Sequence, residues 1–222
     1  MILAIDTATR FVSLALHDGK RLLLESTWLT ANNHSTELPP AIRAAFAQLR
    51  LTPASLQAVA VAQGPGSFTG LRIGMGVAKG IALAQGIPLV AVPTLEIVAA
   101  AVPPAPHPLI ALVQAGRGRV CAQTFRHQDG GWLAQNPPQI TDWQSLFAAV
   151  SESALVAGEV DEQGYVALAA SHAPVHVLPA AVSLRRAGYL AQVAWARLIA
   201  GQTDDPHTVV PIYLHQPGVP HP

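Results

Sequence analysis

The sequence predicts an α/β protein made of two related halves, the second of them abbreviated. Apolar runs of strand length lead in each half, and segments with helical periodicity follow them. Four prolines within 103–108 separate the halves, because such a stretch suits neither a helix nor a central strand. The first half, 1–102, places three strands before its helices begin. This order is typical of an actin-like or ribonuclease H-like half, whereas a doubly wound sheet alternates from the start.

The three opening strands are expected at Ile2–Ile5, Val12–His17 and Arg21–Trp28. An Asp-Gly pair at 18–19 separates the last two runs. Because Asp-Gly between apolar runs is a strong hairpin signal, these two strands should pair antiparallel. From Ser35 the apolar residues recur with helical spacing, which predicts a helix with its apolar face at positions 38, 42, 45, 46 and 49.

A buried strand, Leu56–Ala62, then leads into a glycine-rich loop and a helix from about Leu71 to Gln85. Ile87–Val92 is expected to be another buried strand, and Thr94 should begin a helix that runs through Val102. The second half, 109–222, repeats the order with shorter elements and ends in an irregular tail from Pro211. Its expected strands are Leu109–Gln114, Arg119–Arg126, Ala154–Gly158 and Val175–Leu178, and its expected helices are Asp142–Val150 and Ser183–Ala200.

The composition narrows the function. Lysine plus arginine equals aspartate plus glutamate, 13 each, so tight RNA binding by this chain alone is disfavoured because such binding relies on basic residues. The single cysteine, Cys121, excludes a disulfide framework and a cysteine-based zinc site. The N-terminus resembles no signal peptide, and no apolar run is long enough to span a membrane. These observations predict a cytoplasmic protein.

The glycine loop joins a buried strand to a helix N-terminus, where free backbone N–H groups favour anions. Two interpretations stay open: a phosphate site, or a tight strand-to-helix turn that needs glycine backbone angles. The spacing is G-x-G-x-x-x-G rather than G-x-G-x-x-G, no acidic residue ends the next strand, and no Walker lysine follows. The loop residues are Gly64, Pro65, Gly66, Ser67, Phe68, Thr69 and Gly70.

The helix after this loop is rich in small residues, with Gly74, Gly76 and Gly80 beside Ala78. Each interior glycine costs about 1 kcal/mol of helix stability relative to alanine. Small side chains allow another backbone to come close, so the helix could pack on the chain's own elements or on a second subunit. The sequence alone does not separate these two alternatives.

No catalytic or metal-binding set is expected. Asp6 and Thr7 follow the first strand, and we interpret them as a side-chain-bonded turn because no further carboxylates are placed to complete a metal site. His34 stands before a helix, where capping or surface exposure is expected. His172 and His176 cannot share a helical face, because Pro174 lies between them.

Four segments of the chain resemble the TsaB family, also called YeaZ. The glycine loop followed by Leu-Arg is the most specific of them. The resemblance is densest over residues 1–100. The matching segments are Ile2–Ala8, His34-Ser35, Gly64–Gly74 and Pro211–Leu214.

The resemblance implies the actin-like, sugar-kinase-like (ASKHA) fold and a role in making threonylcarbamoyladenosine beside the tRNA anticodon. It implies a non-catalytic subunit that binds and activates a catalytic TsaD-like paralogue and works with a TsaE-like ATPase. ATP and metal are then expected on the partner subunits, tRNA is reached only through the complex, and the isolated chain could form a homodimer. The His-x-x-x-His motif that TsaD proteins carry is absent from Pro93–Ala99.

Family members associate through the helices that follow the third strand and the glycine loop. The resemblance therefore implies a partner interface at Leu38, Ile42, Phe46, Arg72, Gly74, Gly76, Ala78, Lys79 and Gly80. One segment departs from the family pattern: Gln114–Cys121 lacks the usual acidic residues. Two rival hypotheses remain, an ATP-binding kinase-like enzyme on the same fold and a metallopeptidase. The first needs phosphate loops in both halves, and the second needs metal ligands that the sequence does not offer.

Overall fold

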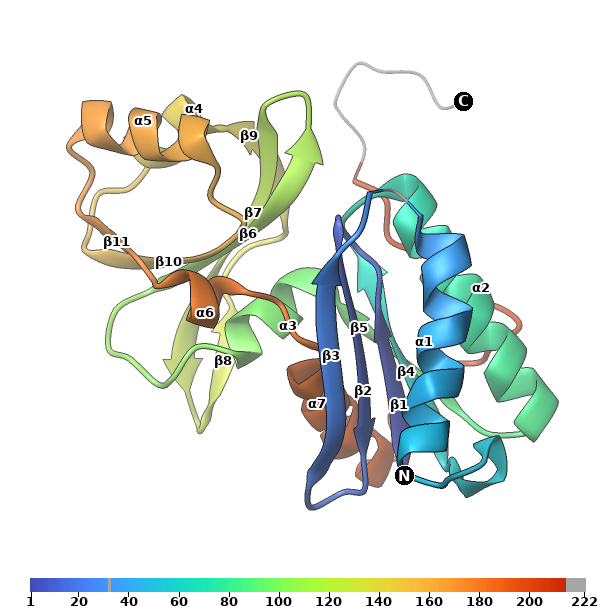
Figure 1. Cartoon of the computed structure of the whole chain (residues 1–222). Coiled ribbons are helices and arrows are strands. Elements are labelled where there is room, and N and C mark those ends of the chain that lie inside the picture. Colours follow the sequence, from blue (N-terminus) through green and yellow to red (C-terminus); the bar gives the residue numbers. More distant parts are fainter. Residues whose placement is uncertain (32, 215–222) are drawn as a thin grey trace. The chain divides into compact units, whose positions relative to one another are not determined.

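A computed structural model describes residues 1–31 and 33–214, which form two compact units (Figure 1). Unit 1 contains Met1–Ile97 and Arg185–Ile212, and unit 2 contains Val98–Leu184 together with Tyr213 and Leu214. Of the predicted irregular tail, 215–222 lie outside the described residues. No helix within the described ranges has the length and apolarity needed to cross a membrane.

The sheet of unit 1 has five strands in the order β3-β2-β1-β4-β5. β1 pairs antiparallel with β2 and parallel with β4, which confirms the opening order of three strands and a hairpin. The strands are β1 (Ile2–Asp6), β2 (Phe11–His17), β3 (Leu22–Leu29), β4 (Ala58–Gly64) and β5 (Leu89–Pro93).

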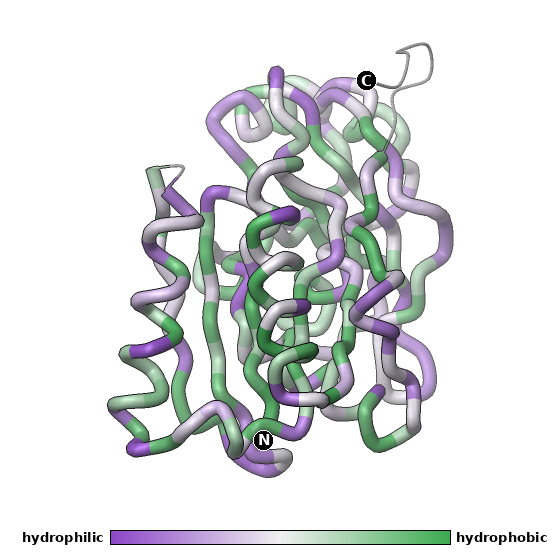
Figure 2. Tube along the Cα trace, turned by 90° about the vertical axis from the view of Figure 1, so that its right-hand side faces the viewer, coloured by the Kyte–Doolittle hydropathy of each residue, from purple (hydrophilic) through white to green (hydrophobic). Residues whose placement is uncertain are grey.

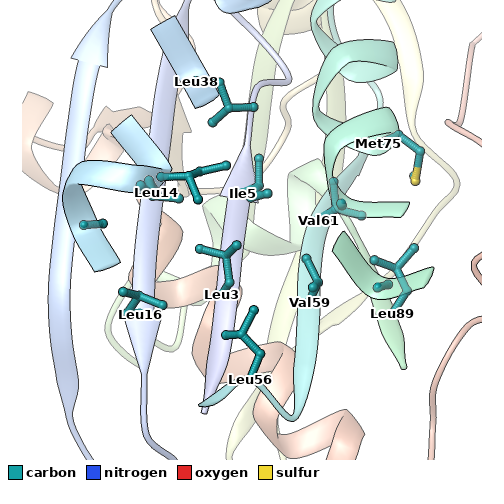
Figure 3. Packing of buried hydrophobic residues seen from close by; sticks show 14 of the residues in the cluster. Leu3, Ile5, Leu14, Leu16, Leu38, Leu56, Val59, Val61, Met75 and Leu89 are labelled. Carbon is teal, nitrogen blue, oxygen red and sulfur yellow. The ribbon is translucent and has the colours of Figure 1, made fainter. Parts of the chain in front are cut away.

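Helices cover both faces of this sheet. α1 (His34–Gln48) and α2 (Phe68–Gln85) lie on one face, and α7 (Ala187–Ile199) lies on the other (Figure 1). The short helix η1 (Pro53–Ser55) lies between α1 and β4, and α3 (Thr94–Ala100) follows β5. The side chains of Leu3, Ile5, Val59 and Val61 point from the sheet towards Leu38 of α1 and Met75 of α2 (Figure 3).

Every residue of β1 is buried because side chains alternate between the two covered faces. Leu3 and Ile5 face α1 and α2, so Ile2, Ala4 and Asp6 face the α7 side. In Figure 2 the strand that begins at the N-terminus is accordingly green. Asp6 is the only charged residue of β1. Its side chain lies in the buried layer between the sheet and α7.

Unit 2 repeats the sheet topology in the order β8-β7-β6-β10-β11, with β6 in the position of β1, and a sixth strand, β9, also pairs with β7. Its edge strands have only four and three residues, so the predicted abbreviated second half is confirmed. The elements are β6 (Leu109–Gly116), β7 (Arg119–Gln128), β8 (Gly131–Ala134), β9 (Gln139–Asp142), α4 (Trp143–Ala148), β10 (Ala154–Gly158), α5 (Glu162–Ser171), β11 (Val175–Val177) and α6 (Ala180–Ser183).

The predicted division at 103–108 is corrected in two respects. The boundary between the units falls at Ile97 and Val98, and the 103–108 stretch belongs to unit 2. The last predicted helix returns to unit 1 as α7, where its buried residues Leu190 and Ala194 cover the face that α1 and α2 leave open. Burial of that apolar face, rather than chain order, determines which unit holds the helix.

Candidate functional site

The glycine loop lies directly against the turn that follows β1. The N–H of Ser67 donates to the carbonyl oxygen of Ala8 at 2.6 Å, and the hydroxyl of Thr7 donates to the carbonyl oxygen of Gly70 at 2.7 Å. A Cβ atom on Gly66 or Gly70 would collide with the carbonyl oxygens of this turn. Gly66 and Gly70 must therefore be glycine, because the backbone of the turn after β1 lies where a side chain would be.

Free donors at the N-terminus of α2 are fewer than an open anion site would offer. The Ser67 hydroxyl accepts from the N–H of Gly70 at 3.2 Å and caps the helix, and the N–H of Gly64 donates to the hydroxyl of Thr94 at 3.1 Å. Gly64 has φ +117°, which favours glycine. Of the two interpretations of the loop, the geometry favours the tight strand-to-helix turn.

Asp6 forms the predicted side-chain-bonded turn, since its Oδ1 accepts from the N–H of Ala8 at 2.9 Å. Its Oδ2 is held by the Nε of Arg185 at 2.5 Å. The side chains of Asp6 and Arg185 are 1% and 2% exposed, so the pair is desolvated. A second guanidinium nitrogen of Arg185 donates to the Thr9 hydroxyl at 3.0 Å. Both carboxylate oxygens of Asp6 are thus occupied by partners from the chain itself.

His34 joins the same polar cluster. It is buried rather than exposed, and its Nε2 lies 2.9 Å from the carbonyl oxygen of Thr9, so the expected surface or capping role is corrected. Because a carbonyl oxygen can only accept, Nε2 carries the proton and donates to it. The N-cap position of α1 is Asn33, and His34 instead fixes the first turn of α1 to the turn after β1.

The arrangement of Asp6, Arg185 and Thr9 is suited to holding structure and not to binding a cation. An arginine is permanently charged, so it neutralises the carboxylate that a divalent metal would need. Among residues 1–31 and 33–214, no three histidine, cysteine, aspartate or glutamate side chains are grouped to hold a metal ion.

The small-residue helix α2 has two different faces. Gly74 and Ala78 are buried, and a Cβ on Gly74 would collide with the hydroxyl oxygen of Thr7. Gly76 and Gly80 are exposed, and a Cβ on either would meet nothing within 4 Å. The two alternatives for this helix thus apply to different residues: one pair packs on the chain's own β1 turn, and the other faces outward.

The outward residues form one stripe, which we call the outer α2 face. Arg72 lies over the ring of Phe68 at 3.8 Å, and the half-buried Lys79 borders the stripe. Phe68 and Leu83 are large apolar side chains that are 49% and 46% exposed. The outer α2 face consists of Phe68, Arg72, Gly76, Gly80 and Leu83.

The predicted interface residues of α1 are corrected. Leu38, Ile42 and Phe46 are at most 8% exposed and belong to the core of unit 1, where they pack against the sheet (Figure 3 shows Leu38). The same correction applies to Gly74 and Ala78. The apolar periodicity that identified these residues marks the side of each helix that faces the core. The residues that α1 exposes to solvent include Pro40, Arg43, Ala44 and Ala47.

The remaining sequence candidates lie in unit 2. The segment Gln114–Cys121 forms the turn between β6 and β7, in which the Gln114 amide donates to the carbonyl oxygen of Glu159 at 2.8 Å. Cys121 is buried, and burial raises the pKa of its thiol to about 12. A thiol with this pKa remains protonated at neutral pH and is a poor nucleophile.

Arg185 is the residue of the cluster that sequence reasoning missed. Its partner Asp6 is 179 positions away, so no spacing rule connects them. One signal was available: Arg185 and Arg186 stand immediately before the N-terminus of α7, where the helix dipole disfavours cations. An arginine pair in that position indicates that carboxylates from elsewhere in the fold form ion pairs with the two guanidinium groups.

Comparison with known proteins identifies relatives of this chain. A family model described as TsaD, tRNA N6-adenosine threonylcarbamoyltransferase, matches residues 28–136. An uncharacterized protein of Mycobacterium tuberculosis is 33% identical over 222 residues, which cover 97% of this chain and 92% of that protein. The tRNA threonylcarbamoyladenosine biosynthesis protein TsaB of Bacillus subtilis is 29% identical over 188 residues, 78% of this chain and 82% of that one.

Solved structures agree with these relatives. A Pseudomonas aeruginosa protein described as similar to peptidase YeaZ superposes with a TM-score of 0.80 at 26% identity, over 96% of this chain and 99% of that one. A ROK hexokinase of Thermus thermophilus, at 14% identity, has a TM-score of 0.50 over 90% of this chain and 99% of its own, and shows the fold alone. With the duplicated sheets, these likenesses confirm the predicted actin-like, ribonuclease H-like fold class.

Proposed function

Because the chain belongs to the TsaB (YeaZ) family, we propose that it serves tRNA threonylcarbamoyladenosine biosynthesis as a non-catalytic subunit. In this proposal it binds and activates a TsaD-like catalytic paralogue in the cytoplasm, together with a TsaE-like ATPase. ATP and metal are bound by those partners, and tRNA is reached through the assembled complex. In isolation the chain uses the same surface to form a homodimer.

The observation that carries the proposal is the outer α2 face. Gly76 and Gly80 each weaken the helix by about 0.5–1 kcal/mol relative to alanine, yet a Cβ atom on either would meet nothing within 4 Å beyond the helix itself in the described chain. Phe68 and Leu83 expose apolar area on the same stripe. A partner backbone that packs closely over the two glycines would account for both features, since small residues permit close helix approach.

The buried ion pair supports the non-catalytic part of the proposal. The kinase-like alternative requires carboxylates that hold Mg²⁺ beside a bound phosphate. Asp6 is the carboxylate at the end of β1, and Arg185 occupies it. The glycine loop next to it is likewise committed to contacts with Ala8 and Thr7. Calorimetry of the isolated chain with Mg-ATP tests this directly, and micromolar binding with turnover would restore the kinase hypothesis.

Co-purification with the TsaD-like protein of the same organism tests the partner surface. The double variant Gly76→Leu, Gly80→Leu places two large side chains where a partner helix is proposed to lie, and it should lose at least ~100-fold in affinity because overpacked contacts cost several kcal/mol. Ala196→Leu is the matched control, since it adds the same side chain to an exposed position of α7 on the opposite face of the sheet.

Retained association of the double variant would contradict the assignment of this surface. Loss of association by both the double variant and Ala196→Leu would show that the effect is not specific to the outer α2 face. Circular dichroism of each variant establishes that it is folded, and the exposed setting of all three positions favours intact folding.

A further inference from the structure

Unit 1 contains a cavity of about 450 Å³ between the β2–β3 hairpin and α7. Its walls come from both ends of the unit's sequence, so it exists only because α7 returns to the first sheet. The side chains that give it its chemical character are His17, Lys20, Glu25, Arg186, Tyr189 and Trp195. None of them belongs to the outer α2 face or to the Asp6 cluster.

Aromatic rings form part of the walls of this hairpin cavity. The rings of His17 and Trp195 lie 6.0 Å apart at an angle of 55°. Gly19 sits so close beneath Trp195 that an added Cβ would collide with the indole, which fixes the ring against the hairpin. The guanidinium of Arg186 lies 4.9 Å from the centre of the Tyr189 ring. Rings held in this way present flat apolar surfaces on which a planar ligand can stack.

Hydrogen-bond donors and positive charge predominate around the rings. Lys20 is exposed and forms no ion pair with any residue of the described chain. The Nε of Arg186 is buried and has no hydrogen-bond partner there, and the nearest carboxylate oxygen, on Glu25, is 3.6 Å from its Nη1. Glu25 is itself engaged, since its other oxygen accepts from the N–H of Gly188 at 2.7 Å. Two cations therefore face one carboxylate that is already partly occupied.

The state of Arg186 indicates that an anion would be accommodated. The Nη2 of Arg186 already donates to the Tyr189 hydroxyl at 3.0 Å, so its Nε is the donor that remains to be satisfied, and a buried donor without a partner is costly. His17 adds a further donor: its Nδ1 accepts from the N–H of Gly19 at 3.0 Å, so the neutral ring carries its proton on Nε2. Arginine beside lysine is a combination suited to phosphate oxygens.

We propose that the hairpin cavity binds one nucleotide, with the base stacked on Trp195 and the phosphate held by Lys20 and Arg186. The volume lies within the range of small-ligand sites, which begins at about 300 Å³. Base stacking on aromatic rings and phosphate contacts with basic side chains are the two interactions that proteins use for unpaired nucleotides. A free mononucleotide and an unpaired nucleotide of an RNA share this chemistry.

The experiment uses the full chain and two probes, adenosine monophosphate and a fluorescein-labelled single-stranded oligoadenylate RNA. Calorimetry measures binding of the first and fluorescence anisotropy binding of the second. Lys20→Gln should weaken binding about tenfold, as expected for loss of one charged contact. Trp195→Leu should weaken it by at least a similar factor through loss of stacking.

Arg21→Gln is the matched control. It neutralises the neighbouring residue, which does not line the cavity and pairs with Asp18 at 2.9 Å. Binding of both probes with loss only in Lys20→Gln and Trp195→Leu supports the proposal, and binding of RNA alone identifies an RNA nucleotide as the source. Equal weakening of probe binding in Lys20→Gln and Arg21→Gln would show that binding depends only on overall positive charge. That result would overturn the proposal.

Two further outcomes overturn the proposal: neither probe binds, or an acidic peptide such as oligoglutamate displaces the RNA and shows the same dependence on Lys20. The inference goes beyond the proposed partner role and does not rest on it. The cavity is lined by residues of α7 and of the β2–β3 hairpin. The helices α7 and α2 lie on opposite faces of the first sheet (Figure 1). Lys20→Gln should therefore still co-purify with the TsaD-like protein, so the two proposals fail independently.

Discussion

At the scale of single residues, the contact that most defines this protein is the buried pair of Asp6 and Arg185. A carboxylate at the end of β1 was visible in the sequence, and its turn could be predicted because Asp-Thr so often bonds its own backbone. The arginine could not be predicted, since only the tertiary fold brings together residues 179 positions apart. The sequence favoured a turn over a metal site because no further carboxylates were in place, and the arginine adds a second reason that the sequence could not supply.

The pair makes a prediction for stability. Arg185→Met leaves a buried, unpaired carboxylate, and Asp6→Asn leaves a buried, unpaired guanidinium, so each single change should lower the free energy of unfolding by about 3–5 kcal/mol. The double variant should lose far less than the sum of the two, because no uncompensated charge remains. Urea denaturation of all four proteins measures the cycle. Additive losses would show that the two side chains do not act as a pair.

At the scale of elements, α2 shows how one composition serves two purposes. Small residues at 74 and 78 let the helix approach the turn after β1, while those at 76 and 80 lie open. The sequence predicted the helix and the significance of its glycines. It did not separate the two pairs, although residues four apart share a face and residues two apart do not. Applying that rule together with the position of the apolar residue Met75 would have assigned positions 74 and 78 to the inward face.

This division predicts opposite effects of one substitution on the stability of the isolated chain. Gly76→Ala and Gly80→Ala should each raise the free energy of unfolding by about 0.5–1 kcal/mol, since alanine favours the helix and meets open space. Gly74→Ala should lower it by about 1–3 kcal/mol, because the added methyl displaces the Thr7 hydroxyl from its bond to Gly70. Urea denaturation measures all three. Equal effects at 74 and 76 would refute the assignment of faces.

Some of the short elements were not predicted from the sequence, although the three-residue strand β11 was. β8 and β9 have four residues each, too few to display an alternation. α5 was also missed, because its apolar residues are spread around the helix and two of them, Tyr165 and Val166, are exposed. Long buried strands such as β4 and β6 were predicted within two residues at their starts, since continuous apolar runs with turn signals at both ends identify them.

At the scale of the whole molecule, the order of elements was enough to predict a duplicated fold but not the path of its last helix. The five strands of the first sheet correspond strand by strand to five of the six strands of the second, as expected from the repeated pattern. α7 crosses back because the first sheet has a second apolar face to cover, and the pattern of a helix does not reveal which sheet it covers.

The return of α7 predicts how fragments behave. Residues 1–97 alone should not give a cooperative urea transition, because one face of their sheet would lie open to water and the carboxylate of Asp6 would lack Arg185. Joining 1–97 to 185–214 through a flexible Gly-Ser linker should restore the transition. A cooperative transition in 1–97 alone would show that α7 is dispensable for the first unit.

The interrupted path of unit 1 also has a consequence for biosynthesis. Strands β1 to β5 leave the ribosome before Val98–Leu184, yet the helix that completes their layer is translated only after that segment. At roughly 5–20 residues per second, synthesis of Val98–Leu184 delays that helix by about 4–17 s. During this interval the nascent chain carries an unfinished sheet while unit 2, encoded without interruption up to Leu184, is free to fold. The half that is made first is therefore the half that matures last.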